Sequence, residues 1–310
     1  MAGRWGAGCA VTLVVLVGGC AGTSDDGSDA APTPESQPEV SSDPPTAPDV
    51  SRAPSPSPSP STPPTSGTPS PPNTPAPPAD ARPDWLGTRV LPERADGLGE
   101  VRPTPPELVD RRFPPPDGRP VADEFSAAIG PIPENVLVRS TWDSDCPVGT
   151  DDLRYITMTF WGFDDHTYIG EMIVNQSVAD EIVGVFEQLY EARFPIEEMR
   201  VVDAPELDAP PTGDGNNTTA FVCRPTTLSD SWSEHAYGMA VDLNPFHNPY
   251  QRGDAVLPEL AGAYLDRERD LPGMITQGDI VTEAFAAIGW GWGGEWSTLK
   301  DWMHFSAAGR

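Results

Sequence analysis

The sequence predicts an α+β fold, a single compact domain with a small antiparallel sheet flanked by helices. Residues 153–163 and 168–174 are rich in β-branched and aromatic residues, with Gly162 and two aspartates at the turn between them, which predicts a hairpin. In residues 175–193, apolar side chains recur at three- and four-residue spacing, which predicts an amphipathic helix. These segments do not alternate as regular βαβ units, and this favours α+β over α/β.

Shorter segments complete the predicted domain. Pro195 ends the first helix, and residues 279–288 form a second amphipathic helix that stops at Gly289. Three further segments are predicted short strands: 199–202, 220–223 and 239–243.

The first twenty residues predict a signal peptide that is not part of the fold. Arg4 is followed by the apolar run 9–17, which is too short to span a bilayer. Val17-Gly18-Gly19-Cys20 resembles the lipobox of bacterial lipoproteins, and this implies a membrane anchor through lipidation of Cys20. The alternative is an ordinary cleaved signal. In both cases the protein is expected outside the cytoplasm, at the cell membrane or in the cell wall.

A tether and an arm are predicted before the domain at 123–310. Residues 21–83 are dominated by proline, serine and threonine and cannot bury enough apolar surface to offset ordering entropy, so we expect a disordered linker. It acts as a spacer or has no role of its own. Residues 84–122 regain apolar side chains, but their proline clusters exclude regular helix, which predicts an extended arm on the domain.

The net charge argues against one class of partner, and the cysteines bear on the compartment in which the protein folds. The net charge of −28 makes nucleic acid an improbable partner, because phosphate binding needs basic surface. Once Cys9 and Cys20 are set aside with the signal, Cys146 and Cys223 remain, as a candidate disulfide in an oxidising compartment or as two buried thiols. We expect a monomer.

Two segments predict a metal site. His235 and Asp242 lie seven residues apart, a spacing that would place them on opposite faces of one straight strand. Gly238 permits a turn between them. His304 supplies a third ligand from a distant segment, and two imidazoles with one carboxylate suit Zn²⁺ with a position left for water. His166 and His247 are expected at the surface, with His247 as the substitute ligand.

A family resemblance follows from these residues. Ser-x-His-x-x-Gly-x-Ala-x-Asp at 233–242, with Asp-x-x-His-Phe at 301–305, resembles the zinc D-Ala-D-Ala carboxypeptidases and related endopeptidases of the VanY/VanX type, peptidase family M15. Segments 216–224, 242–250 and 293–296 support the resemblance, which extends over roughly 130–310. It implies a zinc peptidase of bacterial cell-wall peptides, with His235, Asp242 and His304 as ligands.

The resemblance also implies roles for residues near the metal. Asp301, three positions before the last histidine, corresponds to the general base, since a carboxylate there can take a proton from a metal-activated water. Glu295 competes for this role. Arg224 resembles the arginine that meets the substrate carboxylate or the developing oxyanion; a surface ion pair is the alternative.

Three further residues are assigned to substrate binding: Ser233, Tyr237 and Trp296. Ser233 would otherwise cap its loop, and no base supports it as a nucleophile. Trp296 would stack on a peptide or sugar face, or simply pack.

The function predicted from these features is Zn²⁺-dependent hydrolysis of peptidoglycan stem peptides, in the manner of a D-alanyl-D-alanine carboxypeptidase. An endopeptidase that cuts between L-Ala and D-Glu remains open, as does a non-catalytic lipoprotein that binds the cell wall. The site residue that separates catalysis from a structural metal is Asp301, because structural zinc sites normally have four protein ligands.

Overall fold

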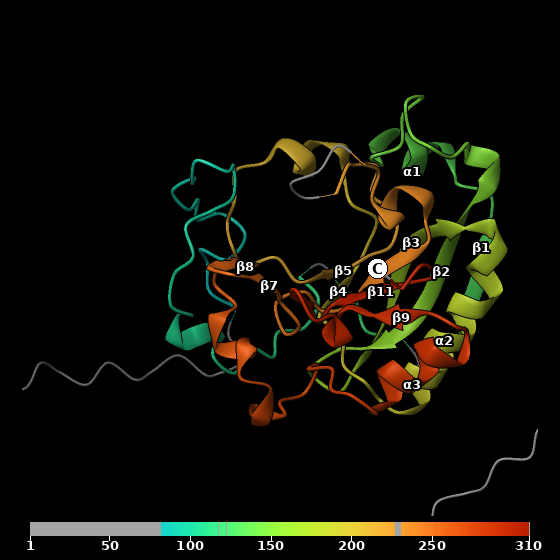
Figure 1. Ribbon diagram of the computed structural model, residues 1–310. Helices are drawn as coiled ribbons and strands as arrows, with labels where there is room; N and C mark the ends of the chain where they lie inside the picture. The colour runs from blue at the N-terminus through green and yellow to red at the C-terminus, as the bar shows by residue number, and fades with distance from the viewer. Residues whose placement is uncertain (1–81, 117, 122, 227–230, 310) are drawn as a thin grey trace, which may run out of the picture. The chain divides into compact units, whose positions relative to one another are not determined.

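The computed structural model describes residues 82–116, 118–121, 123–226 and 231–309 (Figure 1). They belong to one unit of the chain, 70–310. The predicted signal peptide, the lipidation site Cys20 and the linker up to residue 81 lie outside the described residues. The described part contains few helices and several small antiparallel sheets, which confirms the predicted α+β class.

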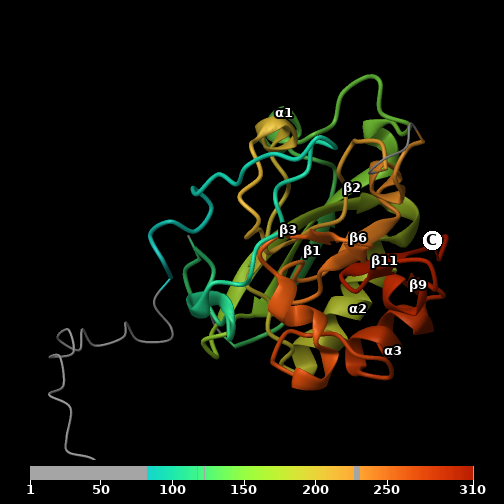
Figure 2. The same ribbon diagram turned by 60° about the vertical axis from the view of Figure 1, so that its left-hand side comes forward.

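The predicted hairpin forms the centre of the largest sheet. Strands β2 (Leu153–Trp161) and β3 (Thr167–Asn175) pair antiparallel, and β1 (Ala127–Gly130) adds to β2, in the order β1-β2-β3. Helix α2 lies against this sheet (Figure 2). The predicted hairpin is therefore confirmed.

Two of the α-helices were predicted, and each begins where a nearby side chain accepts a hydrogen bond from a backbone amide. Helix α2 (Ala179–Glu191) begins after a 3₁₀ turn at Gln176–Val178, in which the Asn175 side chain accepts a hydrogen bond from the Ser177 amide. Helix α3 (Ile280–Ala287) is capped by the Asp279 side chain, which accepts from the Thr282 amide. Helix α1 (Glu134–Arg139) was not predicted.

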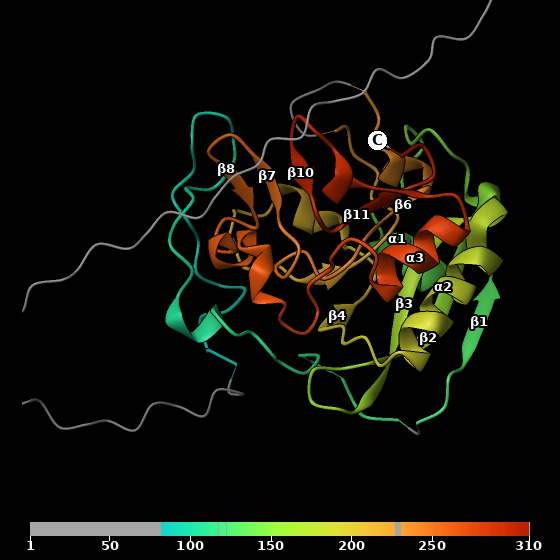
Figure 3. The same cartoon turned by 60° about the horizontal axis from the view of Figure 1, so that its bottom comes forward.

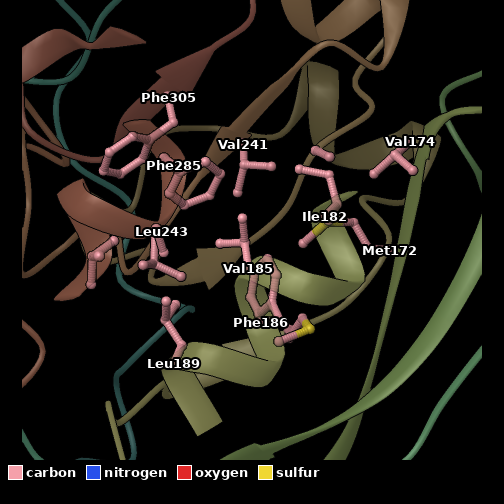
Figure 4. Packing of buried hydrophobic residues seen from close by; sticks show 14 of the residues in the cluster. Met172, Val174, Ile182, Val185, Phe186, Leu189, Val241, Leu243, Phe285 and Phe305 are labelled. Atoms are coloured by element: carbon pink, nitrogen blue, oxygen red, sulfur yellow. The ribbon is translucent and has the colours of Figure 1, made fainter. Parts of the chain in front are cut away.

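The main core lies between α2, α3 and two sheets (Figure 4). Helix α2 contributes a buried stripe at helical spacing, and its side chains meet residues from strands that carry the site described below. Phe285 of α3 stacks on Phe305 with ring centroids 4.1 Å apart. Buried side chains of this core include Ile182, Val185, Phe186, Leu189, Val241, Leu243, Phe285 and Phe305.

Two more three-stranded sheets carry the site. One has the order β6-β11-β9 and consists of Ala240–Asp242, His304–Ser306 and Gly291–Trp292. The other has the order β10-β7-β8 and consists of Lys300–Asp301, Tyr250–Arg252 and Ala255–Leu257 (Figure 3). Strands β4 (Glu198–Met199) and β5 (Asn217–Thr218) form a separate short parallel pair.

The predicted strand at 220–223 is wrong. The amides of this segment bond to three unrelated acceptors: Phe221 to the Ile173 carbonyl, Val222 to the His235 carbonyl and Cys223 to the Thr141 hydroxyl. No single neighbouring strand runs alongside it, so no ladder forms. Of the strand predicted at 199–202, only Met199 belongs to a strand, β4.

The proline-rich arm forms a second hydrophobic cluster with the domain. Leu91, Leu108 and Phe113 are buried, and they belong to the same cluster as Phe246 and Tyr264. Short 3₁₀ helices occur here and elsewhere in the described residues: Pro106–Leu108, Thr150–Asp152, Gln176–Val178, Ala204–Asp208, Glu234–Tyr237, Gly262–Leu265, Arg267–Arg269 and Gly293–Glu295.

Cys146 and Cys223 form a disulfide with a sequence separation of 77. Among the described residues, no helix has both the length and the apolar character needed to cross a bilayer.

Candidate active site

A tight turn brings His235 and Asp242 to the same place. His235 lies in the 3₁₀ turn Glu234–Tyr237, which the Ser233 hydroxyl caps by accepting from the His235 amide. Gly238 follows with φ +67°, a left-handed conformation that reverses the chain before β6 begins. Asp242 is the last residue of β6. The turn expected at Gly238 is present.

Strand pairing brings in the second histidine. β11 runs antiparallel to β6, and His304 is the direct partner of Asp242 in the register. Directly opposed residues of an antiparallel pair on one face have neighbouring side chains. Two residues that are 62 positions apart in the chain are therefore joined by the sheet itself.

The three side chains converge on one point. The Oδ2 atom of Asp242 lies 3.2 Å from Nε2 of His235, and its Oδ1 atom lies 3.1 Å from Nδ1 of His304. The two imidazole nitrogens are 3.2 Å apart. Ligands about 2.1 Å from a tetrahedral zinc ion are about 3.4 Å from one another, so the cluster fits a zinc ion with little adjustment.

The Ala220 carbonyl fixes the tautomer of His235. Its oxygen lies 2.6 Å from Nδ1 of His235, and a carbonyl can only accept a hydrogen bond. In the neutral ring, Nδ1 therefore carries the proton and Nε2 has the lone pair that a metal ion needs. When Nε2 is protonated instead of bound to a metal, the ring is a cation that donates to Asp242. Such a contact behind a histidine ligand orients the ring for a metal. The role of Ala220 could not be predicted from the sequence, because every residue has a backbone carbonyl and the residue type does not show which one contacts a histidine.

Charge within the cluster favours the ionised carboxylate. Burial acts to raise the pKa of Asp242, but the charge of His235 and hydrogen bonds from His235 and His304 lower this pKa well below its ordinary value. Asp242 is therefore an anion that is ready to bind a cation.

Asp301 lies at the edge of the same site. It ends β10, opposite Tyr250 of β7, and a Cβ on Gly293 would lie 2.5 Å from the Asp301 carbonyl oxygen, so only glycine permits this approach. Burial and the negative charge of Asp242 raise the pKa of Asp301 to about 7, against opposing effects of His304 and Arg224. Its Oδ1 atom is buried without a hydrogen-bond partner among the described residues.

A cleft of about 690 Å³ opens over these residues. Arg224 lines it, and the one hydrogen bond of its side chain within the described part of the chain goes to the Pro225 carbonyl. The Trp296 ring lies 5.5 Å from that of His304. The residues that line the cleft include Arg224, Ser233, His235, Asp242, Tyr250, Arg252, Leu257, Trp296, Leu299, Asp301 and His304.

Two of the sequence-assigned residues lie apart from this cleft. Glu295 is exposed, is not among the residues that line the cleft and accepts a hydrogen bond of 3.4 Å from Gln277. Tyr237 is half-buried, and its backbone carbonyl accepts from Asn175; it does not line the cleft either.

The expectation that His247 lies at the surface is wrong. It is fully buried, and its Nε2 atom lies 2.9 Å from the Arg111 carbonyl, in the arm. Burial lowers the pKa of His247 to about 4, so the ring is neutral. His247 is not part of the metal cluster. The His166 side chain is largely exposed, as expected.

Residues 227–307 match a family model described as D-alanyl-D-alanine carboxypeptidase, of the M15 peptidases. The predicted M15 resemblance is confirmed. The matched segment contains all three candidate ligands and Asp301. M15 peptidases are generally metal-dependent, in agreement with the His235, Asp242 and His304 cluster. The comparisons with curated proteins and with solved structures give no match.

Two residues of the cleft were not identified from the sequence. Tyr250 and Arg252 come from β7 and line the cleft through the pairing of β7 with β10. In the sequence, Tyr250 belongs to segment 242–250, which supports the family resemblance but assigns it no role. Strand pairing over some 50 positions gave no local signal that would have placed them.

Proposed function

We propose that this protein is a zinc-dependent D-alanyl-D-alanine carboxypeptidase that acts on peptidoglycan stem peptides. The observation that carries the proposal is the convergence of ligand atoms of His235, Asp242 and His304 within 4.8 Å, in a cleft that Asp301 also lines. The resemblance to the M15 peptidases supports the same reaction class. A structural zinc site would normally have four protein ligands, typically with cysteine.

His235, Asp242 and His304 would hold the ion. When bound, zinc acts as a Lewis acid that polarises a carbonyl oxygen and acidifies a water. The Asp301 carboxylate takes the proton of the attacking water and passes it to the leaving amine. Burial acts to raise the pKa of this carboxyl, which makes it a stronger base than an exposed aspartate.

Arg224 binds the free carboxylate of the substrate or the oxyanion of the transition state. Its guanidinium lines the cleft and has no carboxylate partner within the described residues. A planar fork with parallel donors suits a carboxylate. Ser233 holds the His235 turn through its hydroxyl, and Trp296 forms a wall beside His304.

The sequence supports a place of action outside the cytoplasm, at the cell membrane or in the cell wall. A signal peptide with lipidation at Cys20 would anchor the enzyme at the outer face of the membrane, and the linker at 21–83 would let it reach the wall. Its partners are then the wall peptide and the lipid bilayer, with a monomer as the working form.

Mass analysis of purified muropeptides tests the proposal. Incubation with the protein and zinc should release one terminal D-Ala, and a chelator should stop the release. Release of longer stem fragments would assign the chain to the endopeptidases instead. Intact muropeptides in the presence of zinc would refute peptidase action altogether.

A further inference from the structure

The cleft contains a second arginine. Arg252 ends β7 and lines the cleft together with Arg224. In β7, Tyr250 pairs with Asp301 of β10, and residues two apart in a strand point to the same face. Tyr250 and Arg252 both line the cleft, in agreement with this. The backbone of Arg252 therefore lies about 7 Å beyond that of Tyr250, away from the Asp301 carboxylate.

No carboxylate of the described residues pairs with Arg252. The acid nearest to it in the β7–β8 turn is Asp254, which pairs with Arg94 at 3.5 Å. Seven other arginines of the described residues are ion-paired: Arg82, Arg94, Arg102, Arg111, Arg112, Arg139 and Arg200. Arg154, Arg267 and Arg269 have no ion pair but donate to backbone carbonyls of the chain. In a chain with a net charge of −28, an arginine without a carboxylate partner in a cleft is free to meet an anion from outside.

The Arg252 side chain is exposed, so an anion can reach it from solvent. Two apolar side chains, Leu257 and Leu299, line the same cleft.

We propose that Arg252 is a second carboxylate subsite, which recognises an acidic residue of the peptide on the amino-terminal side of the cut bond. This inference rests on the proposed carboxypeptidase function. A carboxypeptidase leaves one residue beyond the bond, and we assign the carboxylate of that residue to Arg224. A carboxylate at Arg252 must then precede the bond. An extended peptide rises about 3.4 Å per residue, so a separation of about 7 Å corresponds to two residues.

Synthetic peptides that end in D-Ala-D-Ala test the subsite. One set carries glutamate at the second or third position before the bond, and the matched set carries glutamine there. We expect a preference of about tenfold in kcat/KM for one glutamate peptide over its glutamine counterpart, the size of one charge-assisted contact. Arg252→Gln should reduce this ratio to near one, and Arg252→Glu should reverse it.

Arg112→Gln is the matched control. Arg112 is exposed, pairs with Asp110 and is not among the residues of the cleft, so this variant removes the same charge but should keep the preference. Equal kcat/KM for both sets in the wild type, or a preference that survives in Arg252→Gln, overturns the inference and leaves the proposed function intact.

Binding measurements distinguish failure of the proposed function from failure of the Arg252 subsite. If the wild type releases no D-Ala from any peptide, the proposed function fails. Calorimetric binding of the same peptides to the zinc-loaded Asp301→Asn variant then decides on Arg252. Tighter binding of a glutamate peptide that is lost when Arg252→Gln is added supports the subsite, and equal binding refutes it.

Discussion

Asp301 has a buried oxygen without a hydrogen-bond partner among the described residues, and a raised pKa, beside the candidate metal ligands. In Asp301→Asn the amide cannot take a proton, so kcat/KM should fall by about 100-fold or more. Metal content should stay at the wild-type level, because Asp301 is not one of the three ligands. D-Ala release and elemental analysis measure the two properties.

Glu295→Gln is the control for this prediction. Glu295 faces Gln277 and is absent from the lining of the cleft, so its loss should leave kcat/KM near the wild-type value. A zinc-loaded Asp301→Asn protein that remains active, together with an inactive Glu295→Gln protein, would assign the base role to Glu295.

His247 makes stability depend on pH. Burial lowers its pKa from 6.5 to about 4, so the unfolded chain takes up a proton in this range while the folded chain does not. The free energy of unfolding should therefore decrease as pH falls from 6.5 to 4, by up to about 3 kcal/mol from this group.

Urea unfolding at pH 7 and pH 5 measures this effect. His247→Asn does not titrate, so its loss of stability between these two pH values should be smaller than that of the wild type, whatever its stability at pH 7. An equal loss in both proteins would show that His247 is not the group responsible.

Among the structural elements, the turn between the 3₁₀ helix at Glu234–Tyr237 and β6 is the most constrained. Gly238 has φ +67°, and a Cβ there would lie 2.5 Å from the Asn175 amide nitrogen at the end of β3. Gly238→Ala should destabilise the fold by at least about 2 kcal/mol, since left-handed strain and a backbone clash act together. Thermal or denaturant unfolding measures the loss.

Gly184→Ala is the matched control. Gly184 lies in α2, and a Cβ there meets no atom within 4 Å. Alanine has the higher helix propensity, so this variant should be more stable by about 0.5–1 kcal/mol. Equal stability of Gly238→Ala and the wild type would contradict the geometry of the turn.

Local patterns predicted the elements that depend on local physics. The β2–β3 hairpin and helices α2 and α3 have clear periodicity, so their sequence reveals them. Helix α1 has only one buried residue, Val136, and therefore no apolar stripe to recognise. The segment 220–223 has strand-like composition, but its hydrogen-bond partners come from three distant places.

The site shows the same division. Residue type and spacing identified His235, Asp242 and His304 as candidate ligands, because the chain has only four histidines and two of them lie in these motifs. The burial of His247 depends on a contact with Arg111, 136 positions away, and could not be read from its neighbours. The same holds for Arg252, which reaches the cleft through sheet pairing.

At the scale of the whole molecule, two distant connections tie the described residues together. Arg111 of the arm forms a buried, two-bonded ion pair with Glu197, at 2.7 and 2.8 Å. Burial acts to raise the pKa of Glu197, but the charge and hydrogen bonds of Arg111 lower it below its ordinary value. The arm is therefore an integral part of the domain, in addition to its apolar contacts.

The Cys146–Cys223 disulfide is the second connection. It closes a loop with a sequence separation of 77, and the chain-entropy model then gives a stabilisation of about 4 kcal/mol. The double variant Cys146→Ser, Cys223→Ser should lose about this free energy of unfolding. A reducing agent should cause a similar loss in the wild type and none in the double variant; equal sensitivity of both would contradict the prediction.

The proposed peptidase activity depends on one zinc ion held jointly by His235, Asp242 and His304. Native mass spectrometry of the purified protein measures the zinc content of the wild type and of His304→Ala. We expect one zinc ion per wild-type chain and strongly reduced occupancy in the variant. A wild-type chain that binds no zinc, or a His304→Ala chain that keeps its full complement, would contradict it.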